Sequence, residues 1–426
     1  MFRPGWTKRA NAALDALLYG LSVYGVPAAI AVMTLIALST FDRQYGGKDG
    51  IPLDIRVFEQ TGEDAPEPAR ALAQLADQPV VRHLDTKLSE SPFWFSFTVQ
   101  AAKDRERLDI ELPSRHAFAA SCWGAGGRQP LGNADRKGSA GQMKPGKSGF
   151  VLELGQLQAA ETVLCRSVFA GPGRISVLHW PAAEFETSLL KFHRDSGLLD
   201  GGLIVLSLFV LLTALINREW IYVLFAAWLM TNLRLAAISA GWDTQWLERS
   251  IPPEWTLLTR KITVVADYIL TYTLFTTLFR DDLKRVGYSA LLRLAQWSSL
   301  PLLLAGVLLP YAKFLPYMWV TVALGVVVLA FLLGRILLVT RSTVAVWYSI
   351  SLGIALFVSL YEVAAAALGF KMLIGAVNFV TAALASSLMA ALAIAEQMRQ
   401  ERLGRVKAQT ELHSTYEAIP IGLFTL

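Results

Sequence analysis

Long apolar segments dominate the second half of the chain. An apolar run of about 20 residues is long enough to cross the roughly 30 Å of hydrocarbon in a bilayer. One such run occupies residues 17–41, with no charged residue between Asp15 and Asp42. Seven more lie within residues 198–395, at 198–216, 220–239, 262–280, 288–310, 314–335, 343–369 and 372–395. The pattern predicts eight membrane-spanning helices, an N-terminal anchor followed by a seven-helix domain.

Residues 42–197 have a different pattern, because short strand-like runs replace the long apolar ones. In "RLDIELP" polar and apolar residues alternate with a period of two, as on a sheet with one buried face. Similar runs between Gly- and Pro-rich turns are "FWFSFTVQ", "HAFAASCW", "GFVLELG", "TVLCRSVFA" and "RISVLHW". Such spacing predicts an antiparallel β-sandwich of the jelly-roll type. The expected fold class is therefore an α-helical membrane bundle with an inserted, extracytoplasmic all-β domain.

The composition favours a membrane protein over a soluble one. Hydrophobic residues make up 54% of the chain and charged residues only 17%, values that soluble globular chains rarely reach. The net charge of +5 fits the excess of Lys and Arg in the cytoplasmic loops of membrane proteins. We find no basic patch with interleaved aromatic residues, so no nucleic-acid binding is expected. The predicted partner is the lipid bilayer.

Lys and Arg collect on one side of the predicted membrane. They precede the first span and follow or flank the fourth, sixth and eighth, at Arg3, Lys8, Arg9, Arg280, Lys284, Arg285, Arg335, Arg341, Arg399, Arg402, Arg405 and Lys407. Both termini are then expected in the cytoplasm, with residues 1–16 as a tail and residues 42–197 outside. If the first span is instead a cleaved signal peptide, seven spans remain and the N-terminus lies outside. Residues 42–197 are external in both cases.

The chain has two cysteines, Cys122 and Cys165, and both fall in strand-like runs of the outer segment. In an oxidising compartment a disulfide between them is the expected fate. The alternative is a pair of buried free thiols that pack as small apolar side chains. Two cysteines without a suitably spaced histidine are too few for a metal site, so no metal is expected.

Three ionisable residues lie inside predicted spans, namely Arg234, Asp267 and Glu362. Such groups are costly in hydrocarbon and are often functional there. One interpretation is a polar network that exchanges partners between two helix packings or lines a small cavity. The other is a set of fixed interhelical pairs, or side chains that reach an interface, which suits Arg234 best.

No catalytic motif is present in the sequence. It has no Gly-rich phosphate loop ahead of a helix, no HExxH, and no Ser or Cys nucleophile in a recognisable setting. We expect no catalytic residues and no cofactor within these 426 residues. Transport is an alternative function, but we find no internal repeat and no matched pair of Gly/Pro-interrupted spans.

Two segments resemble a known family. "SPFWFSFTVQ" followed by "RLDIELPS", and the junction "AEFETSLLKFHRDSGLLDGGLIVLSLFVLLTALINREW", are similar to bacterial seven-transmembrane receptors with diverse intracellular signalling modules. The likeness covers residues 45–395. It implies a periplasmic jelly-roll sensor domain at residues 42–197 and a location in the bacterial inner membrane. The anchor at 17–41 departs from the family, many of whose members carry a cleavable signal there.

The resemblance also implies ligand-binding candidates. Jelly rolls of this class resemble carbohydrate-binding modules, so Trp94, Trp123 and Trp180 could stack on sugar rings. Core packing is the alternative for at least two of the three. The expected input is a periplasmic ligand, such as a carbohydrate, or a partner protein.

The last predicted span is expected to continue as a cytoplasmic linker helix at 396–416, because strong helix formers fill it. Its apolar positions form a stripe whose heptad is broken at Gly404, so the helix is only weakly suited to a coiled coil. A homodimer through this helix is the expectation, with a solvated single helix as the alternative. The apolar positions are Met398, Leu403, Val406, Leu412 and Tyr416. Residues 417–426, "EAIPIGLFTL", resemble the start of a PAS domain.

Taken with this ending, the resemblance implies a transmembrane signal receptor. Its PAS domain would lead to a cyclic-di-GMP cyclase or phosphodiesterase, or to a histidine kinase. The chain would then be the input and membrane part of a longer receptor, truncated at the start of the PAS domain. A membrane scaffold that recruits partners through its last helix, and a transporter, are the alternatives from other classes.

Overall fold

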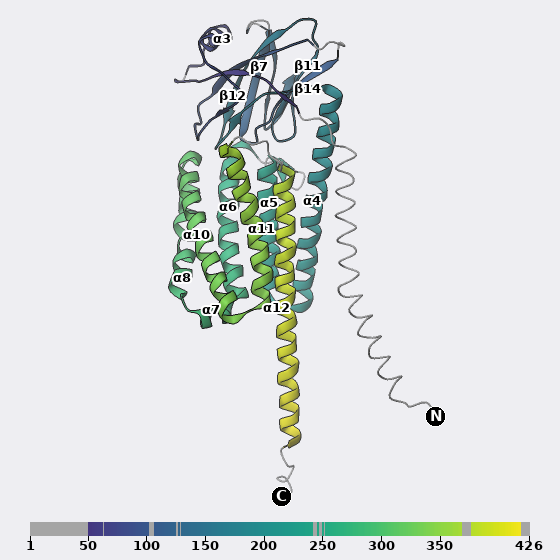
Figure 1. Ribbon diagram of the computed structural model, residues 1–426, viewed down its shortest axis with the longest axis vertical. Coiled ribbons are helices and arrows are strands. Elements are labelled where there is room, and N and C mark those ends of the chain that lie inside the picture. The colour runs from purple at the N-terminus through teal and green to yellow at the C-terminus, as the bar shows by residue number, and fades with distance from the viewer. Residues whose placement is uncertain are drawn as a thin grey trace, which may run out of the picture.

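The computed structural model describes residues 50–418, except residues 63, 102–105, 125–126, 128, 242–244, 247–248, 251 and 369–375. In this part of the chain a β-sandwich-like region lies above a bundle of long helices, and the last helix projects below the bundle (Figure 1). The predicted tail 1–16, the anchor 17–41 and residues 419–426 of the predicted PAS segment lie outside the described residues.

Two antiparallel sheets form the upper region. The first has five strands in the order β1 (Ile51–Pro52), β14 (Leu178–Pro181), β6 (Arg107–Leu112), β11 (Phe150–Gln156) and β10 (Met143–Pro145). The second has seven, in the order β3 (Val80–Val81), β2 (Ile55–Glu59), β5 (Phe93–Val99), β12 (Glu161–Phe169), β7 (Ala117–Gly124), β8 (Gln129–Asp135) and β9 (Ser139–Gly141). A short pair, β4 (Leu84–Asp85) and β13 (Arg174–Ile175), stands apart from both.

The two sheets pack face to face around one hydrophobic core. Inward-facing residues of both sheets build it, among them Phe95, Phe97, Ile110, Phe150, Leu152 and Val163. The alternation of apolar and polar residues along each strand places these side chains on one face. The sandwich predicted from the sequence is therefore present.

Strand β6 differs from the one-sided strand that its alternation predicts. Its outward-facing Asp109 and Glu111 are only 6% and 4% exposed. The reason is α4 (Ala182–Asn217), which starts directly after β14 and packs its first turns on this face of the sheet. Phe185 of α4 lies against Val151 and Trp180 there. Both faces of β6 are thus covered.

A second helix covers part of the other sheet. The Pro- and Ala-rich stretch after β2 forms α3 (Pro68–Ala76). Its Ala71 and Leu75 are fully buried against Trp94 and Leu164 on the outer face of the seven-stranded sheet.

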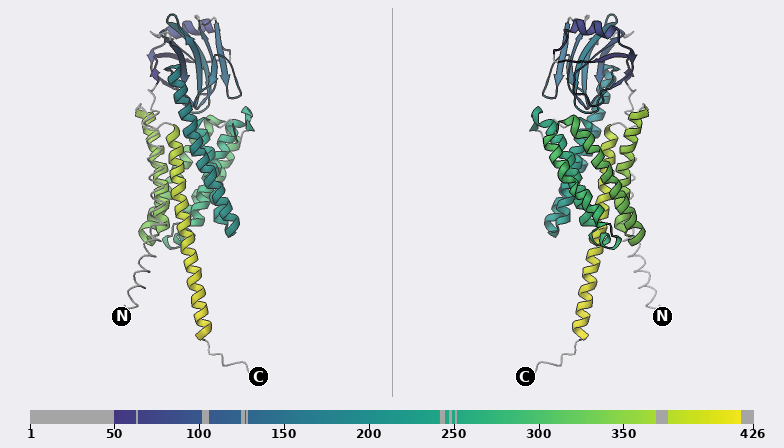
Figure 2. Two further views of the ribbon diagram at one scale, coloured as in Figure 1. Left: turned by 90° about the vertical axis from the view of Figure 1, so that its right-hand side faces the viewer. Right: turned by 90° about the vertical axis from the view of Figure 1, so that its left-hand side faces the viewer.

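The remaining helices form the lower region. They are α5 (Trp220–Ala240), α6 (Pro253–Leu278), α7 (Arg280–Val286), α8 (Ser289–Trp297), α9 (Ser299–Leu308), α10 (Tyr311–Thr340), α11 (Thr343–Leu368) and α12 (Ala376–Ala418). A short hairpin of β15 (Gln245–Trp246) and β16 (Arg249–Ser250) lies between α5 and α6. Two opposite views, each turned by 90° from that of Figure 1, show the helices standing side by side beneath the sandwich (Figure 2).

Several of these helices are long and apolar enough to cross a membrane, which indicates a membrane protein. Over the described residues there are four, or five if the bent pair of α6 and α7 counts as one span. They are Ala182–Asn217, Trp220–Ile238, Ala290–Leu308 and Tyr311–Thr340, with the bent pair at 77°. Each of the seven predicted apolar runs contains helix, but this number of membrane spans remains a prediction.

The predicted span 288–310 is not one regular helix. It divides into α8 and α9 at Ser298, and Pro310 is the N-cap of the next helix, α10. Pro301 explains the division, because it has no N–H to donate to the carbonyl of Trp297 and its ring crowds that carbonyl.

Two predicted boundaries fall inside continuous helices. The predicted division between the outer domain and the helical domain at 197/198 lies within α4, whose 36 residues leave the sheet at Pro181. At the other end, α12 runs from Ala376 to Ala418 without a break, through the predicted linker 396–416 and the first two residues of 417–426. Helices therefore link the two regions and extend beyond the bundle.

Candidate functional site

Two of the three candidate tryptophans lie in packed interiors. Trp94 is 2% exposed beneath α3, its ring stacks on Trp123 at a centroid distance of 5.5 Å, and its Nε1–H donates to Gln60 Oε1 at 3.1 Å. Trp180 is 4% exposed beneath the first turn of α4. Its Nε1–H donates to Glu111 Oε2 at 2.8 Å. For Trp94 and Trp180 the structure places the side chains in core packing.

Trp123 is half-buried and points outward from β7. Ser121, two residues earlier on the same face, lines a surface cleft of about 430 Å³ over β7, β8 and β9. Polar side chains surround a floor of alanine and glycine in this cleft, among them Asn133, Asp135, Lys137 and Ser139. Its volume is within the range of small-molecule sites.

A second cleft, of about 520 Å³, lies between the edge of β2 and the turn after β4. Glu59 and Asp85 line it together with Lys87 and Leu88, two residues with positive φ. Asp85 is paired with Arg174 at 2.7 Å, and this hydrogen bond lowers the pKa of Asp85. The cleft combines apolar and charged walls.

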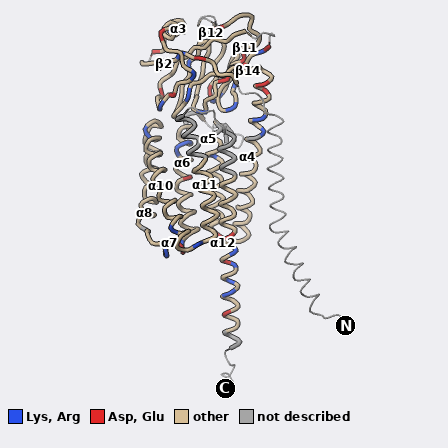
Figure 3. The backbone as a smooth tube through the Cα atoms, viewed as in Figure 1, with Lys and Arg blue, Asp and Glu red and all other residues tan. Residues whose placement is uncertain are grey.

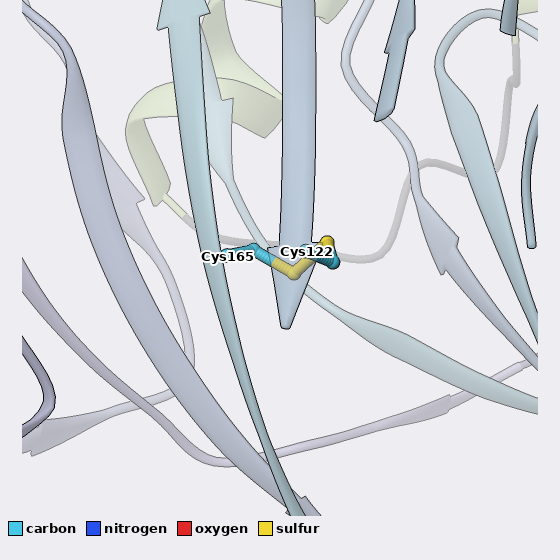
Figure 4. The surroundings of a disulfide bond; sticks show 2 residues. All are labelled: Cys122 and Cys165. Carbon is cyan, nitrogen blue, oxygen red and sulfur yellow. A yellow bond between two sulfur atoms is a disulfide. The ribbon is translucent and has the colours of Figure 1, made fainter. Parts of the chain in front are cut away.

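The two cysteines face each other on neighbouring strands. Cys122 of β7 lies opposite Cys165 of β12, and a disulfide joins them (Figure 4). Both side chains are in the core of the sandwich. The bond crosses the two central strands that carry Trp123 and its neighbours.

Arg136 joins the sandwich to the helical bundle by hydrogen bonds. Its guanidinium donates to the carbonyls of Ala117 at 2.9 Å and Arg115 at 3.0 Å, and reaches across to the carbonyl of Gly241 at 2.9 Å. Gly241 ends α5 with a φ of 77°. A Cβ there would lie 2.8 Å from the carbonyl oxygen of Ser148, so only glycine fits this close approach.

An apolar contact completes this joint. Ala170, at the end of β12, packs with Tyr311 and Leu315 of α10. Beside it, the backbone N–H of Ala312 donates to Glu90 Oε1 at 3.3 Å. Leu88, in the turn that lines the larger cleft, also packs on this cluster. The cleft and the start of α10 therefore share one wall.

Buried ionisable groups lie at both places where the sandwich meets helices. Burial raises the pKa of Asp109 to about 6; Glu153 and Glu186 add to the shift, and Arg107 and Lys144 oppose it. Burial also raises the pKa of its neighbour on β6, Glu111, against the ion pair with Lys147. At the joint with α6, burial and the charges of Arg115 and Arg260 lower the pKa of His116 to about 3.

Inside the bundle, the structure describes the side chains of two of the three predicted ionisable residues, Arg234 and Asp267. Arg234 of α5 is 8% exposed. Asp267 of α6 accepts a hydrogen bond from Thr231 Oγ1 of α5 at 3.3 Å. Glu362 lies on α11, and its side chain is outside the described residues.

Sequence reasoning missed the residues that surround Asp267. Trp228 of α5 donates from Nε1 to Thr271 Oγ1 of α6 at 3.0 Å, one turn from the Thr231 contact. These residues form a polar seam between α5 and α6. A spacing of three residues on α5, Trp228 to Thr231, and of four on α6, Asp267 to Thr271, was the available signal.

At the lower end, α12 contacts the turn between α4 and α5. Arg402 Nη2 donates to Asn217 Oδ1 at 3.3 Å, and Arg405 Nη2 to Glu219 Oε1 at 3.0 Å. One turn higher, Thr343 at the start of α11 donates to Glu396 Oε1 at 3.2 Å. Basic and acidic residues are interspersed along the projecting part of α12 (Figure 3).

Neither a comparison with known family models nor a search of curated proteins finds a match for this chain. Among the residues that the structure describes, no group of His, Cys, Asp and Glu is arranged to hold a metal ion. The described residues thus form a domain with two clefts, a joint between the sandwich and the bundle, a polar seam between α5 and α6, and a last helix, α12, that contacts the turn between α4 and α5.

Proposed function

We propose that this protein is a transmembrane signal receptor. The sandwich would bind a periplasmic ligand or partner, and the bundle would relay the change to a cytoplasmic output module. In this proposal the anchor at 17–41 and all seven later apolar runs cross the bacterial inner membrane, the sandwich is of the jelly-roll type, and both termini are cytoplasmic.

One observation carries the proposal: α4 contacts both the sandwich and α12, the last helix of the described chain. It begins at Pro181, directly after β14, and its last residue, Asn217, accepts a hydrogen bond from Arg402 of α12. A helix of 36 residues is about 54 Å long at a rise of 1.5 Å per residue. A shift of α4 on the sheet therefore moves the support of α12 without any intermediate element.

The relay follows from differential binding. A ligand changes a conformational equilibrium only as far as it binds one state more tightly than the other. The cleft beside Leu88 and the cleft beside Ser121 are the two places where such a ligand would sit. A carbohydrate suits the second cleft, because the hydroxyl groups of Ser121 and Ser139, the amide of Asn133 and charged groups line it.

The output side of the proposal rests on α12. Around the contact of Arg405 with Glu219 it exposes Leu403 and Val406, and further along Leu412, each about 60% accessible. Leu403 and Val406 are one turn apart on the same side of the helix, and a second copy of α12 is the partner that this side would take in a homodimer. The dimer would carry a PAS domain and a cyclic-di-GMP enzyme or kinase, as the family resemblance implies.

The relay is testable without knowing the ligand. A spin label at Val406→Cys is selective, because the structure shows both native cysteines in a disulfide. With the full chain in lipid nanodiscs, Trp180→Phe removes the hydrogen bond to Glu111 beneath α4, and Trp123→Phe is the matched control away from α4. We expect the first substitution alone to change the distance distribution between labels of a dimer. Unchanged distributions with a folded sandwich would refute the relay through α4.

The same sample tests the ligand class. A panel of neutral mono- and disaccharides is titrated onto the full chain, with binding read from tryptophan fluorescence and uptake from sealed vesicles. Binding that shifts the Val406→Cys labels supports a receptor for sugars. Accumulation inside the vesicles would indicate a transporter instead, and absence of binding would refute a carbohydrate ligand.

A further inference from the structure

Two carboxylates of β6 lie under the first turns of α4, and they differ in their partners. Glu111 accepts a hydrogen bond from Trp180 Nε1 at 2.8 Å and forms an ion pair with Lys147 at 3.3 Å. Asp109, two residues earlier on the same face, is 6% exposed. It forms no hydrogen bond or close ion pair with any residue that the structure describes. A buried charge without such partners is costly, so Asp109 is the group here that gains most from binding a proton.

Further carboxylates face Asp109 from the elements packed against β6. The register of the sheet places Glu153 of β11 directly opposite Asp109. Side chains in this relation lie on one face, and like charges there destabilise the pair. Glu186 of α4 adds a third negative charge. Arg107 and Lys144 oppose these charges, but both are exposed, and Lys144 lies 2.6 Å from Glu153.

The other neighbour of β6, strand β14, brings no charge to this face. Trp180 stands opposite Asp109 in the register. His179 stands opposite Ile110, a residue of the sandwich core, and therefore faces the other side of the sheet. Three carboxylates thus meet where α4 leaves the sheet, and the buried one of them lacks a partner.

The turns of α4 on this face are held by a small apolar contact. Phe185 and Leu189 pack there on Val151 and Trp180. This cluster is separate from the hydrophobic core between the two sheets. The helix starts after Pro181, which makes no side-chain hydrogen bond to the first amides. The contact between α4 and β6 is therefore able to open without disturbing the core.

Protonation changes the balance at this contact. While α4 covers Asp109, burial and the charges of Glu153 and Glu186 raise the pKa of Asp109 from 3.8 to about 6. When the first turns of α4 move away, water reaches the carboxylate and the repulsion from Glu186 falls. A group whose pKa is higher in the closed contact stabilises the closed state at low pH. That stabilisation is lost as pH rises through about 6.

We propose that protonation of Asp109 closes the contact between α4 and β6 and its ionisation opens it, so that the sandwich responds to the acidity of the surrounding medium. In acid, Phe185 stays packed on Trp180. At neutral pH the first turns of α4 leave the sheet more often. The transmission of this change to α12 rests on the proposed receptor function, whereas the opening and closing of the contact do not.

Hydrogen exchange of the full chain in lipid nanodiscs tests the contact directly. The protection of amides 186–192 of α4 is measured at pH 4.5 and pH 7.5 and corrected for the intrinsic exchange rate at each pH. It should be up to about 30-fold higher at pH 4.5, as a pKa of about 6 in place of 3.8 implies. Amides 72–76 of α3, which covers the other sheet, serve as an internal control and should not follow this change.

Three variants assign the pH dependence to a residue. Asp109→Asn keeps the shape of the protonated group, so it should fold and retain the high protection of α4 at both pH values. Glu186→Gln, at an exposed residue, removes one repelling charge and should weaken the pH dependence without abolishing it. Asp77→Asn, at an exposed carboxylate beside α3, is the matched control and should behave like the parent protein.

Each other result has a definite meaning. Equal changes of protection in α3 and α4 would show a general loss of stability and overturn the proposal. Protection of α4 that is the same at both pH values in the parent protein would also overturn it, as would a pH dependence that persists in Asp109→Asn. A pH-dependent contact with unchanged distances between Val406→Cys labels would support the proposal and refute only the relay to α12.

Discussion

Arg405 of α12 lies 3.0 Å from the carboxylate of Glu219, which begins α5 at the base of the bundle. Both side chains are partly exposed, 68% and 34%. Ion pairs of this kind contribute only about 0.2–1 kcal/mol. The contact therefore stabilises the position of α12 only weakly. The proposed relay requires a weak contact here, because the contact has to open and close.

Reversing the charge of Arg405 tests whether its ion pair with Glu219 keeps α12 against the turn between α4 and α5. Arg405→Glu places two carboxylates together, so α12 should detach from the α4–α5 turn and become more susceptible to limited proteolysis below the membrane. The double variant Arg405→Glu with Glu219→Arg should restore protection. We expect a coupling of about 0.2–1 kcal/mol in the cycle. Equal cleavage in the single and double variants would mean that the pair does not hold the helix.

Gly241 should tolerate no side chain at the joint. Gly241→Ala combines a positive φ of 77° with a Cβ that would lie 2.8 Å from the Ser148 carbonyl oxygen. We expect a loss of about 1–3 kcal/mol in the stability of the seated sandwich, measured by hydrogen exchange at residues 115–120 and 148. Gly353→Ala on α11, where a Cβ meets nothing within 4 Å, is the control and should be neutral or stabilising. If Gly241→Ala kept its protection from exchange and Gly353→Ala lost it, the close approach of Gly241 to Ser148 would be contradicted.

The buried carboxylate of Asp109 should make the sandwich less stable as pH rises. Its pKa is raised from 3.8 to about 6, so between these values the folded protein binds more protons than the unfolded chain. Stability then falls from pH 4 to 6 and stays low above pH 6, by on the order of 2–3 kcal/mol. Asp109→Asn should remove this penalty and raise the melting temperature at pH 7.5 but not at pH 4.

A control for this pH dependence is Asp77→Asn, at an exposed carboxylate after α3. It should leave the difference between the two pH values unchanged. If Asp109→Asn melted at the same temperature as the parent protein at both pH values, ionising Asp109 in the folded protein would cost little free energy. That result would contradict the prediction.

Removing the disulfide should weaken the sandwich. The bond closes a loop with a sequence separation of 43, and such a loop corresponds to a loss of roughly 2–4 kcal/mol when the cross-link is absent. Cys122→Ala with Cys165→Ala should therefore lower the unfolding temperature of the sandwich. Reducing agent should have the same effect on the parent protein and none on the variant. A parent protein that is insensitive to reduction would contradict this contribution.

Local patterns predicted the elements that depend on short-range periodicity. The alternation in "RLDIELP" and the run "FWFSFTVQ" correspond to β6 and β5, and the seven apolar runs all contain helix. A period of two or a long apolar run is a property of neighbouring residues, so it can be recognised without the fold. The break at Ser298 was readable in principle from Pro301, since proline removes one helical hydrogen bond.

Contacts between distant segments were not predictable in this way. Nothing in the spacing of Trp94 or Trp180 indicates that α3 and α4 cover their strands. The partner of Asp267, Thr231, lies 36 positions away, and the partner of Arg405, Glu219, lies 186 positions away. Such pairs depend on how helices cross, which is set by packing over whole surfaces.

The sequence by itself determined that a segment of short strands with two cysteines is followed by long apolar helices and a polar terminal helix. Each of these features depends on hydrophobic spacing within about 20 residues. Only the tertiary structure decided that α4 runs from β14 to its contact with Arg402 of α12, and that Arg335 lies beside Tyr288. The physical reason is that side-chain burial and pairing depend on which surfaces meet in space, and the chain brings those surfaces together only when it folds.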